Sequence, residues 1–378
     1  MNILVICHYG IYKDFTASFV HNQVKKYVVL GHRVRVVIPI ALGKARDDTR
    51  LDMPIVRKVK DNVEIFYIRF LSLSNWGNKI DFNTKSAMIS IKLTLTRLVK
   101  DFVPDIIHAH TLGLDSEIGS WIKEKIQCPL VVTTHGSDTS ILFRQGERER
   151  LKKYCDKADV VVGVSSILVE MLKKCGTYAS LKVIHNGFET KNIISTRKKI
   201  PYSFIQVGNL IPQKKTDITI RAFAEIVKNY SQAYLVVVGD GPERENLEQL
   251  CRKLKIEKSV QFKGKISNSL VLELMADAKF FIMPSVCEGF GIVYLEAMAS
   301  GCITIGTQGE GISDLIEDGR NGFLVPPDNS EAIFKIVKEC IQNELLETNI
   351  SRKGKDSAKN MTWEVNAKRY VELFQTLL

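Results

Sequence analysis

The stretch SVCEGFGIVYLEAMASG, residues 285–301, decides the fold. Two apolar segments precede it, YLVVVGDG at 234–241 and AKFFIMPS at 278–285, and both are typical of buried strands in a parallel sheet. Within the stretch two glycines flank Phe290 and IVYLEAMA favours a helix, so a strand, a tight loop and a helix N-terminus follow one another. Backbone N–H groups and the positive end of a helix dipole attract anions. The stretch therefore predicts a phosphate site above Gly289 and Gly291.

Two glutamates frame the predicted loop. Glu288 opens it, and Glu296 lies roughly 8 Å along the helix axis beyond Gly291 at the usual rise per residue. A pair that acts on one glycosidic bond should lie roughly 5 to 10 Å apart and face each other. These two are instead placed to hold opposite ends of an elongated ligand. The alternative interpretation is that Glu288 merely begins a loop and Glu296 is a solvated helix carboxylate.

Glu288 and Glu296, with Gly-Phe-Gly between them, resemble the EX7E signature of retaining glycosyltransferases of family 4. The resemblance implies the glycosyltransferase B fold. That fold is an α/β architecture of two Rossmann-like domains facing each other across a cleft, with a C-terminal helix that crosses back to the first domain. It also implies that Glu288 contacts the donor sugar and Glu296 holds the ribose hydroxyls. The amides of Gly289, Phe290 and Gly291 would meet the sugar and the diphosphate.

Length and composition set the class of protein. A chain of 378 residues exceeds one typical core, and with 45% apolar and 25% charged residues it has a globular composition. Its eight cysteines form no CxxC pair and none lies at zinc-ligand spacing from a histidine, which favours a reducing compartment. We find neither a signal peptide nor an apolar stretch of the roughly 18 residues that span a bilayer. We expect a cytoplasmic protein, or one bound peripherally to the inner face of the cytoplasmic membrane.

The positive charge is concentrated in the first half. Residues 1–190 contain 28 Lys and Arg against 19 Asp and Glu, and so carry +9 of the net charge of +11. Such a surface is either simply solvated or binds anionic lipid headgroups or a lipid-phosphate acceptor. The basic clusters carry no motif that reads DNA or RNA, so we expect no nucleic-acid partner.

The first domain, predicted at 1–190, opens with a strand, a helix and a strand. The resemblance places Gly10, in the first loop, on the acceptor side. Two later strands end in PDIIHAH and PLVVTTH, so His110 and His135 lie at the sheet edge where ligands bind in open α/β sheets. A lone histidine is usually structural, but two from neighbouring strands favour a site. By resemblance His135 lies by the donor sugar, and His110 is assigned to the acceptor side.

The second domain, predicted at 200–360, repeats the winding, and 361–378 forms the returning helix. After its first strand the family usually has an arginine and a lysine that neutralise the donor diphosphate; Asn209 and Lys214 occupy those positions here. Lys215, the next residue, is expected to be mainly solvated. Gly264 and Lys265 match the place where the family seats the nucleotide base. No DxD motif of metal-dependent transferases is present, so we expect no metal and no cofactor.

These observations predict a retaining glycosyltransferase that uses a UDP or GDP sugar and a saccharide or lipid-linked acceptor in bacterial surface polysaccharide or glycolipid synthesis. Glu288, His135 and Lys214 are the predicted catalytic residues. No motif supplies the base that inverting transfer needs, and the resemblance implies that a departing phosphate oxygen takes the acceptor proton. The alternatives are an epimerase or phosphorylase on the same fold, or a non-catalytic sugar-nucleotide-binding protein.

Overall fold

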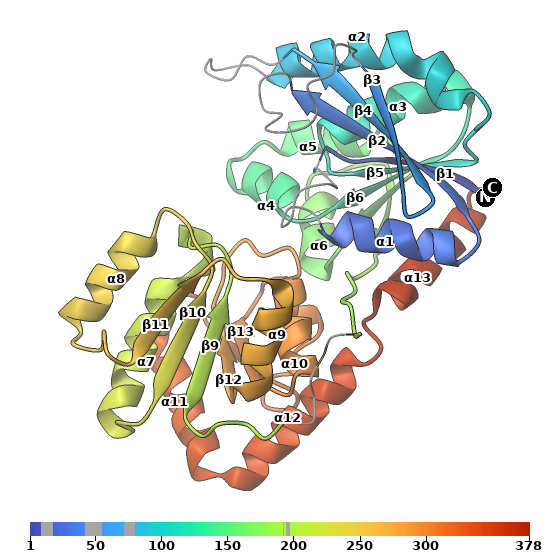
Figure 1. Ribbon diagram of the computed structural model, residues 1–378. Helices are drawn as coiled ribbons and strands as arrows, with labels where there is room; N and C mark the ends of the chain where they lie inside the picture. Colours follow the sequence, from blue (N-terminus) through green and yellow to red (C-terminus); the bar gives the residue numbers. More distant parts are fainter. Residues whose placement is uncertain (9–17, 42–54, 72–79, 192, 194–196) are drawn as a thin grey trace. The chain divides into compact units, whose positions relative to one another are not determined.

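The computed structural model describes residues 1–8, 18–41, 55–71, 80–191, 193 and 197–378. The chain divides into two compact units (Figure 1). The first unit comprises Met1–His185 and Trp363–Leu378, and the second comprises Asn186–Thr362. The sequence predicts divisions at 190–200 and at 361. Across the described helices, no segment combines the length and the apolarity that a membrane crossing needs.

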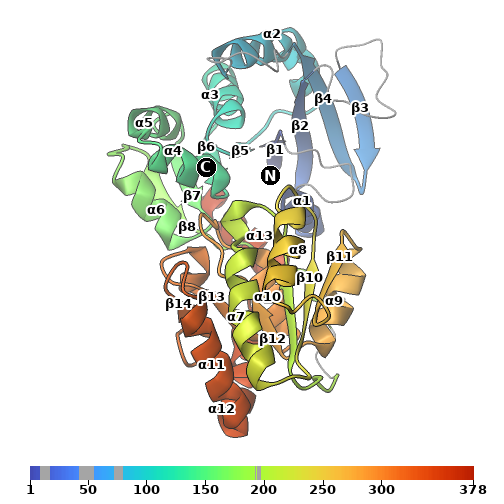
Figure 2. The same cartoon turned by 90° about the vertical axis from the view of Figure 1, so that its left-hand side faces the viewer.

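The described part of the first unit contains an eight-stranded sheet in the order β3-β4-β2-β1-β5-β6-β7-β8. Neighbouring strands run parallel, except that β3 and β4 pair in antiparallel fashion at one edge (Figure 2). The strands are β1 Asn2–Ile6, β2 Arg33–Ala41, β3 Ile55–Lys60, β4 Val63–Phe70, β5 Ile106–His110, β6 Leu130–Thr134, β7 Val160–Gly163 and β8 Ser180–Val183. The central strands β5, β6 and β7 are buried along their whole length, as strands covered on both faces require.

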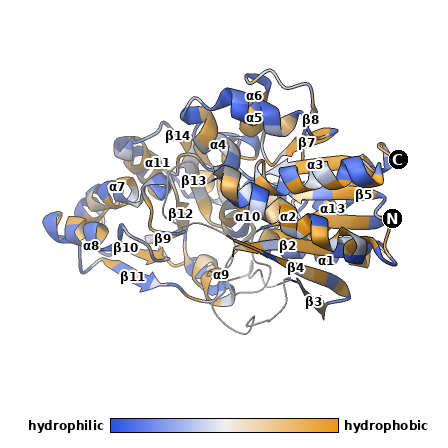
Figure 3. Cartoon of the chain, turned by 90° about the horizontal axis from the view of Figure 1, so that it is seen from above, coloured by the Kyte–Doolittle hydropathy of each residue, from blue (hydrophilic) through white to orange (hydrophobic). Residues whose placement is uncertain are grey.

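Helices cover both faces of this sheet. They are α1 Ser18–Val29, α2 Ile80–Val99, α3 Leu114–Ile126, α4 Ser137–Arg144, α5 Arg148–Cys155, α6 Ser166–Lys173 and α13 Trp363–Gln375. Figure 3 shows hydrophobic residues along most of the strands, whereas the helices alternate between the two kinds of residue. One apolar cluster joins α1 and α13 to the sheet, and a second joins α2 and α3 to the opposite face. The unit is therefore wound on both sides of its sheet.

The C-terminal helix α13 packs on the first unit, as predicted. Gln23 of α1 donates through Nε2 to Asn366 Oδ1 at 2.7 Å, and the hydroxyl of Tyr370 lies 2.8 Å from Thr133 Oγ1 on β6. All three of Ala367, Tyr370 and Phe374 are buried. The last 16 residues thus complete a core that the first half of the chain begins.

The second unit contains a six-stranded parallel sheet in the order β11-β10-β9-β12-β13-β14. Its elements are β9 Ser203–Val207, η1 Pro212–Lys214, α7 Thr216–Asn229, β10 Tyr234–Val238, α8 Arg244–Lys253, β11 Val260–Gly264, α9 Asn268–Asp277, β12 Phe280–Ile282, α10 Ile292–Ala299, β13 Ile303–Thr307, η2 Gly311–Asp314, β14 Phe323–Val325, α11 Ser330–Gln342 and α12 Glu344–Ala358. This is the strand order of the Rossmann fold. The predicted α/β class with two doubly wound units is confirmed.

Each sheet has a point at which the winding changes direction. In the first unit β1 lies between β2 and β5, and in the second unit β9 lies between β10 and β12. The connections that leave the two central strands at such a point turn to opposite faces, and a crevice opens beyond their carboxyl ends. The sequence therefore builds one candidate ligand site into each unit.

Candidate functional site

The crevice of the second unit brings Lys214 and Glu288 together. Lys214 ends the short helix η1 that follows β9, and Glu288 lies in the loop that follows β12. Their side chains form an ion pair, in which Lys214 Nζ donates to Glu288 Oε2, and each is about one-fifth exposed. Backbone contacts tie the same two loops, since Val286 N donates to the carbonyl of Gln213 at 2.8 Å. Because β9 and β12 are neighbours in the sheet, the loops that follow them bring Lys214 and Glu288 into contact.

The backbone around Glu288 is held in an unusual conformation. Cys287, immediately before it, has a φ of 60°, and Gly291 at the start of α10 has a φ of 79°. A Cβ at Gly291 would lie 2.6 Å from the ring of Tyr294, so only glycine fits there without a shift. The backbone N–H of Glu288 donates to Glu310 Oε2 at 3.0 Å, and Glu310 is 8% exposed. Glu310 is therefore a positioning residue for Glu288, and its place between Gly309 and Gly311 is the signal that could have identified it.

Phe290 and Gly289 are buried, and the ring of Phe290 belongs to the core rather than to the surface of the crevice. Any contact that these two residues make with a ligand must therefore come from the backbone. The helix α10, which begins directly after Gly291, supplies further N–H groups. The loop can bind an anion through its backbone, in the manner predicted for the Gly-Phe-Gly segment.

Glu296 lies on α10 and accepts a hydrogen bond from Asn268 Nδ2 at 3.1 Å. Burial raises the pKa of Glu296, and the hydrogen bond from Asn268 opposes that rise. Asn268 begins α9, three residues after Lys265. The structure thus connects Glu296 to the loop that carries Gly264 and Lys265, both at the end of the edge strand β11. Sequence reasoning did not identify Asn268.

Asn209 and Lys215, which lie in the same loop as Lys214, have other partners. Asn209 is exposed just after β9, and the backbone carbonyl of Asn209 accepts from the N–H of Ile211 at 2.9 Å. Lys215 pairs with Asp328 at 2.7 Å and is only 26% exposed. The prediction of a mainly solvated Lys215 was wrong, although its side chain does turn away from the pair that Lys214 makes with Glu288. Lys214 is thus the residue whose side chain pairs with Glu288 in the loop after β12.

His110 and His135 of the first unit lie against each other. Their rings stack with centroids 5.4 Å apart, and His110 Nδ1 lies 3.1 Å from His135 Nε2. Burial lowers the pKa of His110 well below its usual value. Burial, with a smaller contribution from the charge of His8, lowers the pKa of His135 to about 3. His110 ends β5, as predicted, but it is only 1% exposed, so its side chain is buried at the sheet edge instead of facing a ligand site. It is better described as a support for His135.

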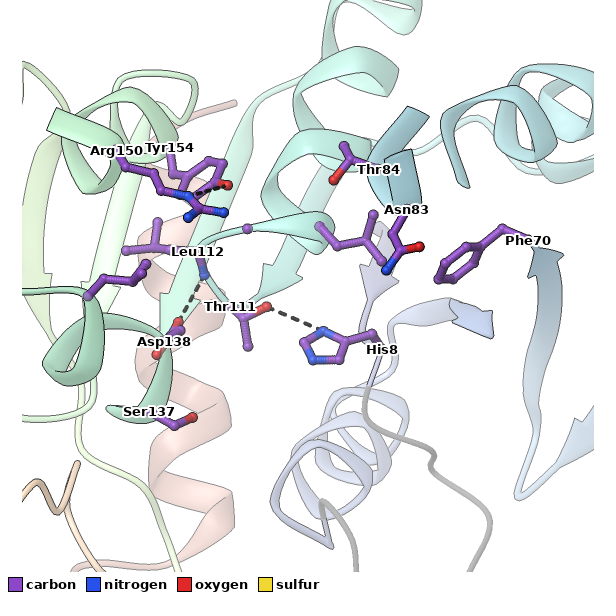
Figure 4. A pocket seen from close by; sticks show the side chains of 13 residues that line it. His8, Phe70, Asn83, Thr84, Thr111, Leu112, Ser137, Asp138, Arg150 and Tyr154 are labelled. Carbon is purple, nitrogen blue, oxygen red and sulfur yellow. Dashed lines mark hydrogen bonds between the residues drawn. The ribbon is translucent and has the colours of Figure 1, made fainter. Parts of the chain in front are cut away.

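A cavity of about 420 Å³ lies at the carboxyl ends of the strands of the first unit (Figure 4). Its lining combines polar and apolar side chains, namely His8, Phe70, Asn83, Thr84, Thr111, Leu112, Gly113, Leu114, Ser137, Asp138, Leu142, Arg150 and Tyr154. His8 follows β1, and Thr111 follows β5. The cavity therefore occupies the point where the winding of this sheet changes direction. It belongs entirely to the first unit.

A carboxylate on α4 holds the loops beside this cavity. Asp138 Oδ2 accepts from Leu112 N at 2.9 Å, and Asp138 Oδ1 accepts from Thr134 Oγ1 at 2.7 Å. The backbone N–H groups of His135 and Gly136 also donate to Oδ1, at 3.2 and 3.1 Å. Burial raises the pKa of Asp138, and the hydrogen bond from Thr134 and those from the backbone oppose the rise. Asp138 thus fixes the His-Gly-Ser-Asp turn.

Two further predictions concern Gly10 and metal binding. Gly10, predicted on the acceptor side, lies outside the described residues. Within the described ranges no group of three or more His, Cys, Asp and Glu side chains is arranged to hold a metal ion.

His8 and Asp115 form a hydrogen-bonded pair beside the cavity. They were missed in the sequence because 107 positions separate them and no short motif contains both.

Comparison with known proteins links both units to one group. The family model described as Glycosyltransferase Family 4 matches residues 16–192, and the model described as Glycosyl transferases group 1 matches residues 188–357. The uncharacterized glycosyltransferase MJ1178 of Methanocaldococcus jannaschii is 30% identical over 261 residues, which cover 69% of this chain and 72% of the relative. The N-acetyl-alpha-D-glucosaminyl L-malate synthase of Bacillus anthracis is 27% identical, over 72% of this chain and 74% of that protein.

A solved structure extends the comparison to the whole chain. The crystal structure of Anabaena Alr3699/HepE in complex with UDP matches with a TM-score of 0.77 and covers all of both chains. The sequence identity is 20%, so this likeness shows the fold.

Proposed function

The chain belongs to the group 1 glycosyltransferases of family 4, and from this premise we propose that it moves a hexosyl residue from a nucleoside-diphosphate sugar to a saccharide or lipid-linked saccharide. The donor nucleotide is UDP or GDP, the anomeric configuration is retained, and no divalent cation is needed. The product enters a bacterial surface polysaccharide or a glycolipid.

The observation that carries the proposal is the contact between Lys214 and Glu288 at the crevice of the second unit. The cation lies beside the loop that leads into α10, whose first backbone N–H groups have no partner within the helix, and together these groups suit a diphosphate. A departing diphosphate places its developing charge on these groups, which are already in position. Glu288 then faces the sugar, where a carboxylate stabilises oxocarbenium character.

Other residues of the second unit are proposed to bind the ribose and the base of the donor. Glu296 and Asn268 present a carboxylate and an amide, which accept and donate hydrogen bonds as ribose hydroxyls require. Gly264 and Lys265, at the end of β11, seat the base. His135 of the first unit is a neutral imidazole at neutral pH, since burial lowers its pKa to about 3. Support for UDP as the nucleotide comes from Anabaena Alr3699/HepE, which was crystallised with it.

The acceptor occupies the cavity of the first unit. Its volume of about 420 Å³ is within the usual range for a small-molecule site. Polar groups for sugar hydroxyls come from Asn83, Thr84 and Tyr154, and Phe70 supplies an aromatic face (Figure 4). Arg150 adds a cation, which suits an acceptor that carries a phosphate.

The first unit also contacts an anionic membrane through α2. The outward face of this helix presents Phe82, Ile89 and Leu93, which are 41%, 60% and 78% exposed. Exposed Lys85, Lys92 and Arg97 lie on the same face. Cations beside exposed apolar side chains are the pattern of a helix that lies on an anionic bilayer. Asn83 and Thr84 of the same helix line the cavity, so a lipid-linked acceptor would be received close to the membrane.

The proposal is tested with a panel of UDP and GDP sugars. A donor that binds the native protein raises its melting temperature. NMR spectroscopy of the sugar first released from that donor then gives its anomeric configuration. We expect the configuration of the donor, in the presence of EDTA as well as in its absence. Release of the opposite anomer contradicts retention, and a panel with no thermal shift and no cleavage contradicts the proposed function.

A further inference from the structure

Asn268 and Glu296 form a side-chain pair at the crevice of the second unit. Asn268 is the first residue of α9, which follows β11, and Glu296 lies in the middle of α10, which follows β12. Asn268 Nδ2 donates to Glu296 Oε1 at 3.1 Å. Among the residues that the structure describes, neither side chain has another hydrogen-bond partner. The position of the carboxylate therefore depends on this one amide.

The apolar pattern of α9 places Asn268 on the buried face of the helix. Residues spaced at i, i+3, i+4, i+7 and i+8 share one face, and those that follow Asn268 in this pattern are buried, namely Val271, Leu272, Met275 and Ala276. Helix α9 packs against α10. Asn268 itself is exposed, because it lies at the helix end that follows the carboxyl end of β11. A polar side chain at the start of an apolar face thus meets the carboxylate of the neighbouring helix.

The amide also favours the charged form of Glu296. Burial raises the pKa of Glu296, and the hydrogen bond from Asn268 opposes that rise. Because a carboxylate only accepts, the amide presents its nitrogen to Glu296 and turns its oxygen, Oδ1, the other way. The bond occupies Glu296 Oε1 and leaves Oε2 as an acceptor. Each side chain thus offers one acceptor oxygen, and a vicinal diol supplies two hydroxyl donors.

We propose that Asn268 holds the Glu296 carboxylate in place for the ribose hydroxyls, and that the pair makes the crevice select ribonucleotides over nucleotides that lack these hydroxyls. This inference rests on the proposed function, which places Glu296 at the ribose. Asn268 lies outside the motif that identifies Glu296, and it acts mainly through that carboxylate. A nucleotide without the hydroxyls leaves both oxygens without a ligand donor, which costs affinity.

The test measures the binding of two ligands by calorimetry, without added metal. One ligand is UDP or GDP, whichever raises the melting temperature of the wild type, and the other is its 2′,3′-dideoxy analogue. The variants are Asn268→Ala, Asn268→Asp, Glu296→Ala and the double substitution to alanine. Ser269→Asp is the matched control, because Ser269 is the next residue of α9, is exposed, and has its hydroxyl 3.0 Å from that of Ser267. The melting temperature of each variant shows that it is folded.

We expect Asn268→Ala to weaken binding of the ribonucleotide by about tenfold, which corresponds to the loss of one hydrogen bond to a charged group. Asn268→Asp should weaken it further, because a second carboxylate repels Glu296, whereas Ser269→Asp should stay within about twofold of the wild type. The dideoxy analogue should bind the wild type more weakly than the ribonucleotide does, and Asn268→Ala should change its affinity less than about twofold. In the Glu296→Ala background, Asn268→Ala should have no further effect.

Three results would overturn the inference and leave the proposed function standing. They are wild-type affinity in Asn268→Ala, equal losses for the two ligands in that variant, and equal affinity of the wild type for the two ligands. Absence of binding of both UDP and GDP to the wild type overturns the proposed function and this inference with it.

Discussion

Lys214 and Glu288, separated by 74 positions in the chain, neutralise each other at the crevice of the second unit. The cation proposed for the diphosphate is therefore already engaged before any donor arrives. On the proposed placement of the donor, a bound diphosphate would share or displace the carboxylate, and a displaced Glu288 is predicted to turn toward the sugar. The ion pair thus couples nucleotide binding to the position of the residue proposed to act on the sugar.

This coupling predicts opposite effects on binding and turnover for Glu288→Gln. Loss of the carboxylate charge releases Lys214, so affinity for the nucleoside diphosphate should be unchanged or higher. Turnover should fall by about 10²-fold or more, because charge stabilisation in the transition state is lost. Steady-state kinetics and calorimetry on the same preparation measure both. Turnover at the wild-type level contradicts the role given to Glu288.

Asn209→Arg should strengthen nucleotide binding. Asn209 is exposed at the end of β9 and occupies the position where the family usually has an arginine. A guanidinium there can add one charge-assisted hydrogen bond to the diphosphate, worth about 1.5 to 3 kcal/mol when well aligned. We expect a gain in affinity for the free nucleoside diphosphate of up to about 150-fold, measured by calorimetry. A loss of affinity would show that the diphosphate does not lie beside this residue.

Membrane binding should depend on the exposed face of α2. Substitution of Ile89 and Leu93 by serine removes apolar side chains that are 60% and 78% exposed, so the fold should not change. Cosedimentation with vesicles of phosphatidylglycerol and phosphatidylcholine should weaken in this variant, and in the wild type it should weaken steeply as salt rises. Leu345→Ser, on α12 of the second unit and 73% exposed, is the matched control. If the wild type does not bind these vesicles, or binds them independently of salt, the proposed membrane contact is contradicted and the basic surface is simply solvated.

The buried His108 should make the first unit less stable in acid. Burial, with a smaller contribution from His135, lowers the pKa of His108 to about 3, whereas in the unfolded chain it is about 6.5. Between these values the unfolded chain binds a proton that the folded chain does not, so this stability is present above pH 6.5 and is lost as the pH falls. Between pH 7 and pH 5 the loss from this residue should be about 2 kcal/mol.

Urea unfolding at the two pH values measures the effect, with His108→Gln for comparison. Tryptophan fluorescence reports on the first unit, because residues 76, 121 and 363 all fall within its ranges. His108 lies 2.8 Å from Thr133 Oγ1, and a glutamine amide can replace that hydrogen bond. The variant should lose less stability between pH 7 and pH 5 than the wild type does. Equal losses would show that His108 is protonated in the folded protein.

The family, the two doubly wound units and the returning helix were all predictable from the sequence, and they are confirmed. Buried strands such as 234–238 and the Gly-Phe-Gly loop are local patterns, which periodicity and glycine placement reveal. The partners of Glu288 and Glu296 were not predictable, because Glu310 and Asn268 reach them through tertiary packing. His8 and Asp115 were missed for the same reason, and the burial of His110 depends on helices far away in the chain. The roles given to the site residues stay predictions.

Calorimetric titration of Lys214→Ala and Lys215→Ala tests the central claim most directly. The two lysines are adjacent, yet Lys214 pairs with Glu288 and Lys215 with Asp328. With UDP or GDP, whichever binds the wild type, and without added metal, Lys214→Ala should lose about 10- to 150-fold in affinity. Lys215→Ala, which removes only a partly exposed pair, should stay within about threefold of the wild type. Equal losses in the two variants, or binding that requires a divalent cation, would contradict the placement of the diphosphate at Lys214.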